Sequence, residues 1–290
     1  MTGISAYRTG VPELPELEAF VRAQRDRLTA EPIEAVPVAH FATVKTIDPP
    51  IGSLAGRRFS DVRRRAKRLL FETADGPVLV LHLMSAGRLA VGPSHPKSSV
   101  FAIRFAGGTE LAMSEPGSKR RAAVWLLSPE AAAAELAHLG PEPLDPAFDT
   151  AALRRALEQH PHRLHAFLRD QRAIAGIGRA YANEILHDAR LSPYANGSAL
   201  SDEQVERLHA SIVGLLGTDT ERLVPLSEKG LAAKSARGYR VHDRLGQQCP
   251  VCGNEIRQVS FDEHTIYYCP TCQTEGRVLA DRRLSRLLRD

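Results

Sequence analysis

The stretch PELPELEAF, residues 12–20, opens an acidic and leucine-spaced segment near the start of the chain. Apolar residues continue at roughly helical spacing after it, which predicts a helix over residues 13–29. The positions that share this spacing are Leu14, Leu17, Phe20, Val21, Gln24 and Leu28. The notable feature is a proline–glutamate pair at the head of the helix, with eleven residues in front of it.

Short strand-like runs follow this helix. Residues 78–91 (VLVLHLMSAGRLAV) and 98–113 (SSVFAIRFAGGTELAM) carry leucine and β-branched residues, broken by turns that contain glycine. The pattern predicts a β-sandwich or barrel with an amino-terminal helix, and we assign it to a domain over residues 12–128.

The pattern changes at residues 126–148, where an alanine-rich helix leads into a connector spaced by prolines. We take residues 129–148 as a linker. Residues 149–245 are then mainly helical, and Ser201 followed by Gln204 predicts a capping box. The fold class is therefore α+β with several domains.

All four cysteines lie near the carboxyl end, as Cys249, Cys252, Cys269 and Cys272. Two C-x2-C pairs can close tetrahedrally around one zinc ion, and the sixteen residues between the pairs alternate as a β-hairpin does. Free thiols or a redox pair are the alternatives. Because four thiolates leave no open position, we expect one structural zinc in a finger over residues 246–290.

The formal net charge of +4 and the pI near 9.0 agree with a polyanionic partner, although an ordinary mildly basic protein has the same values. No apolar run reaches membrane-spanning length, and the first residues lack the apolar core of a signal peptide. We expect a soluble protein of the cytoplasm with no membrane partner.

Two glycines, Gly176 and Gly178, separate two helical stretches. Glycines allow a tight turn, and the following helix amino terminus can bind a phosphate oxygen, with Arg179 adding charge. A packing turn between helices is the alternative. In a basic chain with a zinc hairpin, we favour binding to a nucleic-acid backbone.

The order of these motifs resembles the formamidopyrimidine-DNA glycosylase and endonuclease VIII family of base-excision-repair enzymes. Further matches are RRRAKRLLF (63–71), HLMSAGRL (82–89), LGPEPL (139–144) and CPTCQ (269–273). The resemblance implies an amino-terminal β-sandwich, a helix-two-turns-helix domain and a zinc-finger hairpin, with damaged double-stranded DNA between the halves. It also implies a monomeric, nucleoid-associated enzyme of bacterial type, a hydrolase and lyase that removes the base and cuts the strand at the abasic (AP) site.

On this resemblance Pro12 is the nucleophile, Glu13 the acid and base, and Lys67 a phosphate ligand. A terminal amine has a pKa of about 7.7–8.0, so roughly a fifth to a third of it is unprotonated near pH 7.4. Without the family, Lys67 would be one more charge in a solvated basic run. Glu16 and Glu18 are expected to be ordinary charges on the helix face.

The resemblance also suggests DNA contacts away from the nucleophile. His264 stands where the family places a finger arginine, and a solvated loop histidine is the alternative. Met84 is a candidate to fill the gap left by a flipped base, as is the basic stretch with Lys119, Arg120 and Arg121, which reads equally well as a basic β-turn. The family's usual arginine-x-phenylalanine-glycine loop is absent.

A proline inside the chain has an amide nitrogen, which cannot form a Schiff base. We therefore expect the working protein to begin at Pro12, either by initiation at Val11 or by trimming. The alternative is a non-catalytic binder of damaged or abasic DNA with a blocked proline. A zinc-finger protein unrelated to repair would explain the cysteines but not PELPELE.

Overall fold

The structure is a computed structural model, and it describes residues 11–74, 76–116, 120–232, 238–261 and 264–280. The described residues fall into two compact units. The first takes the chain up to His138 together with the segment 219–236, and the second takes Leu139–Thr218 with the chain from residue 237 onward. The sequence-based boundaries at residues 128, 148 and 245 remain predictions about independently folding domains.

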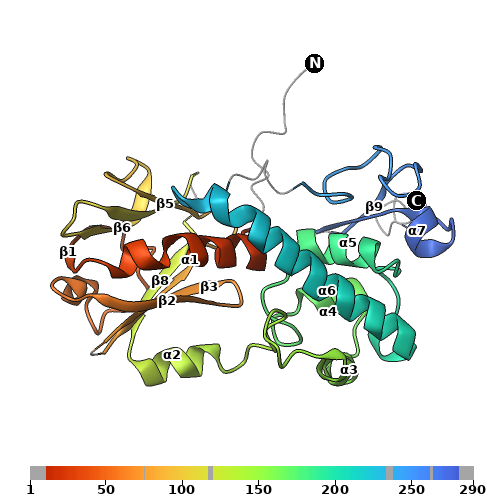
Figure 1. The fold of residues 1–290 in the computed structure, drawn as a ribbon, viewed down its shortest axis with the longest axis horizontal. Coiled ribbons are helices and arrows are strands. Elements are labelled where there is room, and N and C mark those ends of the chain that lie inside the picture. Colours follow the sequence, from red (N-terminus) through yellow and green to blue (C-terminus); the bar gives the residue numbers. More distant parts are fainter. Residues whose placement is uncertain (1–10, 75, 117–119, 233–237, 262–263, 281–290) are drawn as a thin grey trace, which may run out of the picture. The chain divides into compact units, whose positions relative to one another are not determined.

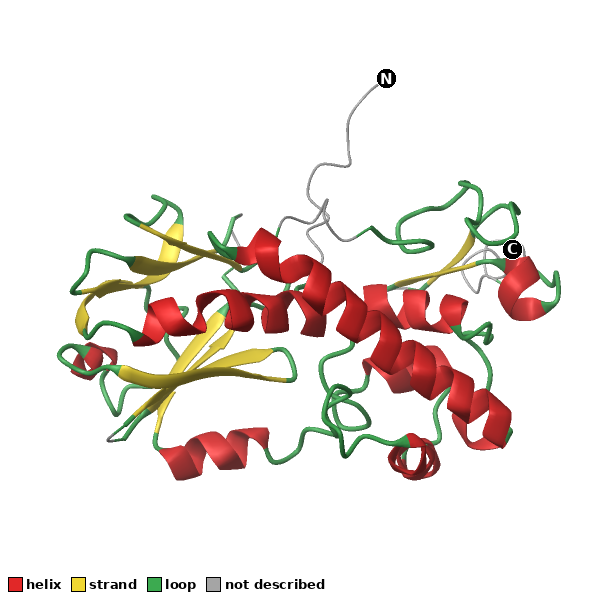
Figure 2. Cartoon of the chain, in the orientation of Figure 1, coloured by secondary structure: helices red, strands yellow, loops and turns green. Residues whose placement is uncertain are grey.

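The helices and strands follow in chain order (Figures 1 and 2). The first unit contains α1 (Leu14–Thr29), β1 (Ile33–Ala39), η1 (Ile51–Leu54), β2 (Phe59–Arg65), β3 (Arg68–Thr73), β4 (Val78–His82), β5 (Arg88–Gly92), β6 (Ser99–Phe105), β7 (Glu110–Ser114), β8 (Ala123–Leu127), α2 (Pro129–Leu136) and η3 (Val224–Ser227). The second contains α3 (Thr150–Gln159), α4 (Leu164–Arg169), α5 (Arg179–Asp188), η2 (Gly197–Ala199), β9 (Arg257–Ser260), β10 (Thr265–Tyr268) and α7 (Pro270–Thr274). Helix α6 (Asp202–Leu223) contributes residues to both.

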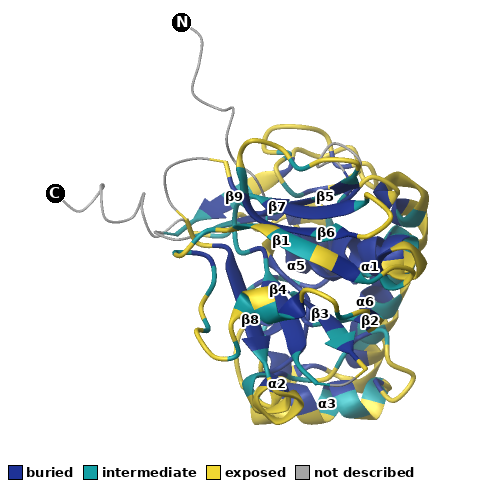
Figure 3. Ribbon diagram, turned by 90° about the vertical axis from the view of Figure 1, so that its left-hand side faces the viewer, coloured by how far each residue is buried: buried dark blue, intermediate teal, exposed yellow. Residues whose placement is uncertain are grey.

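The first unit is built on two four-stranded antiparallel sheets. Their strand orders are β1-β6-β7-β5 and β2-β3-β4-β8. Buried side chains from both sheets and from α1 form one apolar core, which includes Phe20, Phe59, Phe71 and Phe101. Figure 3 shows dark blue buried residues along β5, β6 and β7 and on α1. The predicted β-sandwich with an amino-terminal helix is confirmed.

Helix α1 begins one residue later than predicted and buries every apolar position that the spacing indicated. Its N-cap is Glu13, and a capping box joins Glu13 to Glu16: the Glu13 side chain accepts from the backbone of Glu16, and Glu13 N–H donates to Glu16 Oε2 at 2.9 Å. Glu16 is only 1% exposed. The prediction of Glu16 as an ordinary surface charge is therefore wrong. Glu18 is paired with Arg22 and Arg64.

The second unit is helical, with the finger hairpin against it. The predicted capping box of α6 is confirmed, because Ser201 N–H donates to Gln204 Oε1 at 2.9 Å and Gln204 N–H donates to Ser201 Oγ at 3.3 Å. Strands β9 and β10 pair antiparallel, with Thr265 opposite Ser260 and Tyr268 opposite Arg257. Among the described residues, no helix is long and apolar enough to cross a membrane.

Candidate active site and metal centre

The amino end of α1 positions Pro12 and Glu13. Both residues are buried, and Glu13 is 3% exposed. Arg64 Nε donates to Glu18 Oε2 at 3.1 Å, and Arg25 Nε donates to the Val62 carbonyl at 3.1 Å. Helix α1 therefore runs along β2 with its first turn towards the end of β2 at Arg65.

Strand pairing brings Lys67 to the same end of the sheet. Lys67 and Ala66 form the turn between β2 and β3, and Ala66 has a φ of 52°. Next in the sheet, Arg68 pairs with His82 at the end of β4, and His82 pairs with Ala123 at the start of β8. The first turn of α1, the β2–β3 turn, the residues after β4 and those before β8 thus share one end of this sheet.

Met84 follows β4 in a tight turn, in which Gly87 N–H donates to the Leu83 carbonyl at 2.9 Å. A Cβ on Gly87 would lie 2.5 Å from that carbonyl oxygen, so only glycine fits there. Met84 itself has a φ of 51°. The left-handed region costs a non-glycine residue about 1–2 kcal/mol, so the backbone here would favour glycine or asparagine.

Glu115, which is 1% exposed, holds the residues directly before β8. Its carboxylate accepts from the backbone N–H groups of Arg121 and Ala122 at 2.8–3.1 Å. Arg120 donates to the Glu115 carbonyl, and Arg121 is exposed. Lys119 lies outside the described residues. The structure therefore places Arg120 and Arg121 at the same sheet end as Lys67 and Met84.

His82 is an uncharged neighbour in this group. Burial, and then the positive charges of Arg68 and Lys67, lower the pKa of His82 from 6.5 to about 4. The imidazole is therefore neutral at physiological pH, and it adds no positive charge beside Lys67.

In the second unit, the predicted glycine turn lies between α4 and α5. Gly176 has a φ of 85°, which favours glycine, and Gly178 is the N-cap of α5 with Arg179 as its first residue. Gln171, which the sequence gave no reason to select, holds the turn: its amide accepts from Gly176 N–H at 2.9 Å and donates to the Ile177 carbonyl at 2.8 Å.

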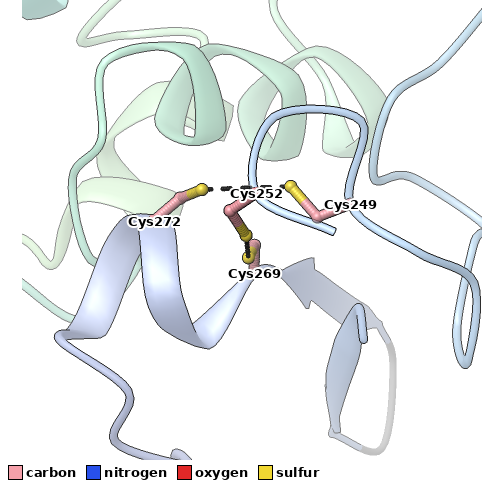
Figure 4. A group of neighbouring side chains, drawn as sticks. All are labelled: Cys249, Cys252, Cys269 and Cys272. Atoms are coloured by element: carbon pink, nitrogen blue, oxygen red, sulfur yellow. Dashed lines mark hydrogen bonds between the residues drawn. The ribbon is translucent and has the colours of Figure 1, made fainter. Parts of the chain in front are cut away.

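The four cysteines meet as the spacing predicts (Figure 4). All four Sγ atoms lie within 4.8 Å of one another, with 3.4 Å between those of Cys252 and Cys269 and 3.9 Å between those of Cys249 and Cys272. Tetrahedral zinc with Zn–S bonds of about 2.3 Å sets thiolates roughly 3.8 Å apart. The site therefore fits one structural zinc ion, and His187 Nε2 lies 3.2 Å from Cys249 Sγ, as an N–H donor to a thiolate would.

Two further contacts join the finger segment to the helices. The buried carboxylate of Glu184 in α5 accepts from the backbone N–H groups of Arg240, Val241 and His242 at 2.8–3.0 Å. These three donors lie in the segment before the finger. Burial raises the pKa of Glu184, and the three N–H groups oppose that shift.

His264, at the tip of the finger hairpin, is not a solvated loop residue. Its ring stacks on Phe261, with centroids 4.7 Å apart, and on His165 of α4, with centroids 5.7 Å apart. His165 is 2% exposed, and burial, followed by nearby positive charge, lowers its pKa well below 6.5. The ring of His264 thus contacts both Phe261 and His165 of α4.

Three family models match this chain. The formamidopyrimidine-DNA glycosylase N-terminal domain matches residues 11–123, and the H2TH domain of the same glycosylase matches residues 139–222. The zinc finger found in FPG and IleRS matches residues 246–274. A formamidopyrimidine-DNA glycosylase of Methylococcus capsulatus is 34% identical over 272 residues, which cover 91% of this chain and 100% of that protein. The chain belongs to the formamidopyrimidine-DNA glycosylase family.

Other comparisons agree with this membership. A formamidopyrimidine-DNA glycosylase-like protein of Mycobacterium tuberculosis is 44% identical over 151 residues, covering 52% of this chain and 94% of that one. The crystal structure of MutM (Fpg) from Thermus thermophilus superimposes with a TM-score of 0.77 at 30% identity, covering 92% of this chain and all of that one. The complex of Lactococcus lactis Fpg with Fapy-dG DNA gives 0.79 at 25% identity, covering 90% and 100%.

Within this glycosylase fold, the predicted site residues separate into two groups. Pro12, Glu13, Lys67, Met84, Arg120 and Arg121 lie in the first unit, at one end of the β2-β3-β4-β8 sheet. Gly176, Gly178, Arg179, His264 and the four cysteines lie in the second. Sequence analysis missed Glu115, His82 and Gln171, because their roles arise from hydrogen bonds and strand pairs to residues several positions away.

Proposed function

We propose that the chain excises damaged bases from double-stranded DNA through Pro12, Glu13 and Lys67, and then cleaves the strand at the abasic site. As a member of its family, the protein is a DNA glycosylase and abasic-site lyase of base excision repair. The observation that carries the residue assignment is the convergence of the α1 amino end with the β2–β3 turn, established by the contact between Arg64 and Glu18.

The chemistry requires a free secondary amine on Pro12. That nitrogen attacks C1′ of the deoxyribose, the bond from C1′ to the base breaks, and the base leaves with a proton. Glu13 donates a proton to O4′ as the sugar ring opens, which leaves an iminium between Pro12 and C1′. The iminium makes the C2′ proton acidic, and removal of this proton by a base expels the 3′ phosphate.

Lys67 and the basic turn act on the phosphates beside the lesion. Lys67 lies in a tight turn at the same sheet end as Pro12, and its ammonium is suited to a single phosphate oxygen. Arg179 and the positive end of the α5 dipole bind a further phosphate, and His264 binds one from the finger. The four cysteines would hold a zinc ion that keeps the hairpin in position. Because four thiolates leave no open position for substrate, its role is structural.

The partner is damaged DNA, and we infer that the protein acts as a monomer on the nucleoid of a bacterial cytoplasm. The segment before the finger, residues 227–244, is shorter than in enzymes that cover an oxidised guanine, which favours an endonuclease VIII-like lesion preference. Excision assays on one duplex with an oxidised purine and one with an oxidised pyrimidine test this directly.

Borohydride trapping tests the assignment of the nucleophile. Two forms are compared on a duplex with one abasic site: a chain whose initiator methionine precedes Pro12 and is removed, and the 290-residue chain with its amino terminus retained. We expect a covalent protein–DNA adduct from the first form and none from the second. Equal trapping by both forms would assign the nucleophile to another amine.

Glu13→Gln in the Pro12-initiated form is the matched control for catalysis. A glutamine at the N-cap still offers an oxygen to the Glu16 backbone, so α1 is retained. Base excision should fall by at least about 100-fold, the usual contribution of a general acid or base, with lesion binding unchanged. Loss of binding together with excision would indicate a structural role. A protein that binds abasic DNA in both forms, but traps in neither, would be the non-catalytic binder.

A further inference from the structure

The guanidinium of Arg64 lies between helix α1 and the turn that carries Lys67. Its Nε donates to Glu18 Oε2 of α1 at 3.1 Å, and its Nη1 donates to the Ala66 carbonyl at 3.0 Å. The Arg64 side chain is only 5% exposed. Because removing a charge from water is costly, a buried arginine is normally found where both its charge and its N–H groups have partners. Here those partners connect the helix to the β2–β3 turn.

The helix side of this connection is held by a second arginine. Glu18 Oε1 accepts from Arg22 Nε at 3.0 Å, while Glu18 Oε2 accepts from Arg64. Arg22 in turn lies 2.6 Å from Glu221 Oε1, near the end of α6. Each oxygen of the Glu18 carboxylate therefore has its own guanidinium partner, and the carboxylate cannot rotate without breaking both contacts. Glu18 is thus a fixed acceptor for Arg64.

The turn side has a backbone conformation that alanine adopts only with strain. Arg65 pairs with Arg68, so Ala66 and Lys67 are the two central residues of the hairpin turn. Of these two, only Ala66 has a positive φ, at 52°. A positive φ at the first central residue alone is the pattern of a type II′ turn, which usually has glycine at that position. Alanine needs support from its surroundings to remain there.

The peptide group between Ala66 and Lys67 determines the direction in which the lysine side chain leaves the turn. Type I′ and type II′ turns differ in the sign of φ at the second central residue, and rotation of the central peptide produces that change of sign. Such a change at Lys67 would rotate its Cα–Cβ bond relative to the strands. Arg64 Nη1 binds the carbonyl of this same peptide. A contact at that carbonyl therefore restricts the direction of Lys67.

A purely structural link between α1 and β2 is the simpler explanation for Arg64, and Arg25 shows what such a link looks like. Arg25 Nε donates to the Val62 carbonyl at 3.1 Å and lies 3.0 Å from Asp61 Oδ1, with its side chain 49% exposed. Arg25 thus joins the same helix to the same strand. Arg64 differs from it in two respects, because it is buried and because its backbone acceptor belongs to the turn and not to the strand.

We propose that Arg64 is a positioning residue, which holds the β2–β3 turn against α1 so that Lys67 stands at a fixed distance from Pro12. A lysine has a flexible four-carbon stem, so the direction of its Cα–Cβ bond is what the backbone can fix. Arg64 itself binds no phosphate in this arrangement, because its guanidinium is buried between Glu18 and the turn. The inference rests on the proposed function for the phosphate at Lys67, and on the contacts of Arg64 for the positioning.

The salt dependence of DNA binding tests this role without any catalytic step. The probe is a duplex with a non-cleavable tetrahydrofuran abasic analogue, and the slope of log affinity against log salt concentration reports how many phosphates the protein neutralises. Lys67→Met should lower the magnitude of that slope by about one and weaken binding by roughly 10-fold, as loss of one charged phosphate contact does. Arg64→Met keeps an unbranched side chain and should reproduce both losses. Combining the two substitutions should add no further loss, because both remove the same contact.

Arg25→Met is the matched control, because it removes the same charge and a guanidinium that joins the same two elements. It should leave the slope at the wild-type value. The urea midpoint of Trp125 fluorescence establishes that each variant is folded. If Arg64→Met does not fold, Arg64→Lys takes its place with the same expected result, since lysine keeps the buried charge but lacks the planar fork that reaches two acceptors at once.

The outcomes separate this inference from the function on which it rests. A wild-type slope in the Arg64 variant, beside a lowered slope in Lys67→Met, overturns the proposal. So does a further loss in the double variant, because additive losses belong to residues with independent roles. A wild-type slope in Lys67→Met would refute the phosphate contact of the proposed function, and the positioning role with it. Failure of borohydride trapping with the coupled loss intact would refute the assignment of Pro12 and leave the role of Arg64 standing.

Discussion

Replacement of Glu184 by alanine should destabilise the finger end of the protein without affecting the β-sandwich. The carboxylate is 5% exposed and accepts from three backbone N–H groups in the segment that precedes the zinc ligands. Alanine removes all three acceptors at once. The segment 240–242 would then have no anchor on α5 from this side chain.

The loss of unfolding free energy expected for Glu184→Ala follows from how deeply each N–H donor is buried. The Val241 hydrogen bond is buried, and leaving its N–H unsatisfied costs about 1–3 kcal/mol. The bonds from Arg240 and His242 are partly buried, so water can replace the acceptor, at about 0.5–1 kcal/mol each. We expect a total loss of about 2–5 kcal/mol. Because burial raises the pKa of Glu184, its ionised form is disfavoured, and the loss of free energy on substitution includes no strongly favourable charge interaction.

Two probes separate the units in one denaturation experiment. Trp125, the sole tryptophan, lies in β8 of the first unit, and release of zinc to a chromophoric chelator reports on the second. In urea, Glu184→Ala should lower the midpoint of zinc release and leave the Trp125 midpoint in place. Glu203→Ala, on the exposed first turn of α6, is the control and should shift neither. An unchanged zinc-release midpoint in Glu184→Ala would refute the reasoning.

Two further predictions concern the catalytic end of the sheet. Met84→Asn, which suits a φ of 51°, should change the free energy of unfolding by less than about 1 kcal/mol and lower single-turnover excision on duplex DNA by at least about 10-fold; a stability loss larger than 2 kcal/mol would assign Met84 to packing instead. His82 should make the β-sandwich acid-sensitive. Because its pKa is about 4 in the folded state and 6.5 in the unfolded state, the unfolded chain binds more protons between these values. The contribution of His82 to the free energy of unfolding is then at its full value above about pH 6.5. Up to about 3 kcal/mol of this free energy is lost as the pH falls towards 4. The Trp125 midpoint measured against pH should show this slope, and His82→Gln should reduce it; an identical slope in the variant would contradict the assignment.

Several features could be predicted from the sequence because they depend on neighbours along the chain. The cysteine pairs show their zinc site through C-x2-C spacing, and α1 and the α6 capping box follow from residues three or four positions apart. The family resemblance selected Pro12, Glu13 and Lys67 as a set. Short-range geometry fixes the helix, capping-box and C-x2-C patterns, so a single sequence contains them, whereas the set of Pro12, Glu13 and Lys67 came only from the resemblance.

Tertiary structure alone decided which of the remaining charges and aromatic residues are exposed, buried or adjacent. Glu16 looks like a surface charge by composition, yet it closes a buried box with the N-cap of its own helix. Phe41 is a large apolar residue, yet its side chain is 86% exposed. The physical reason is strand register: pairing between β3, β4, β8 and the segment at Val44 brings together residues up to 80 positions apart, and no local pattern contains that pairing.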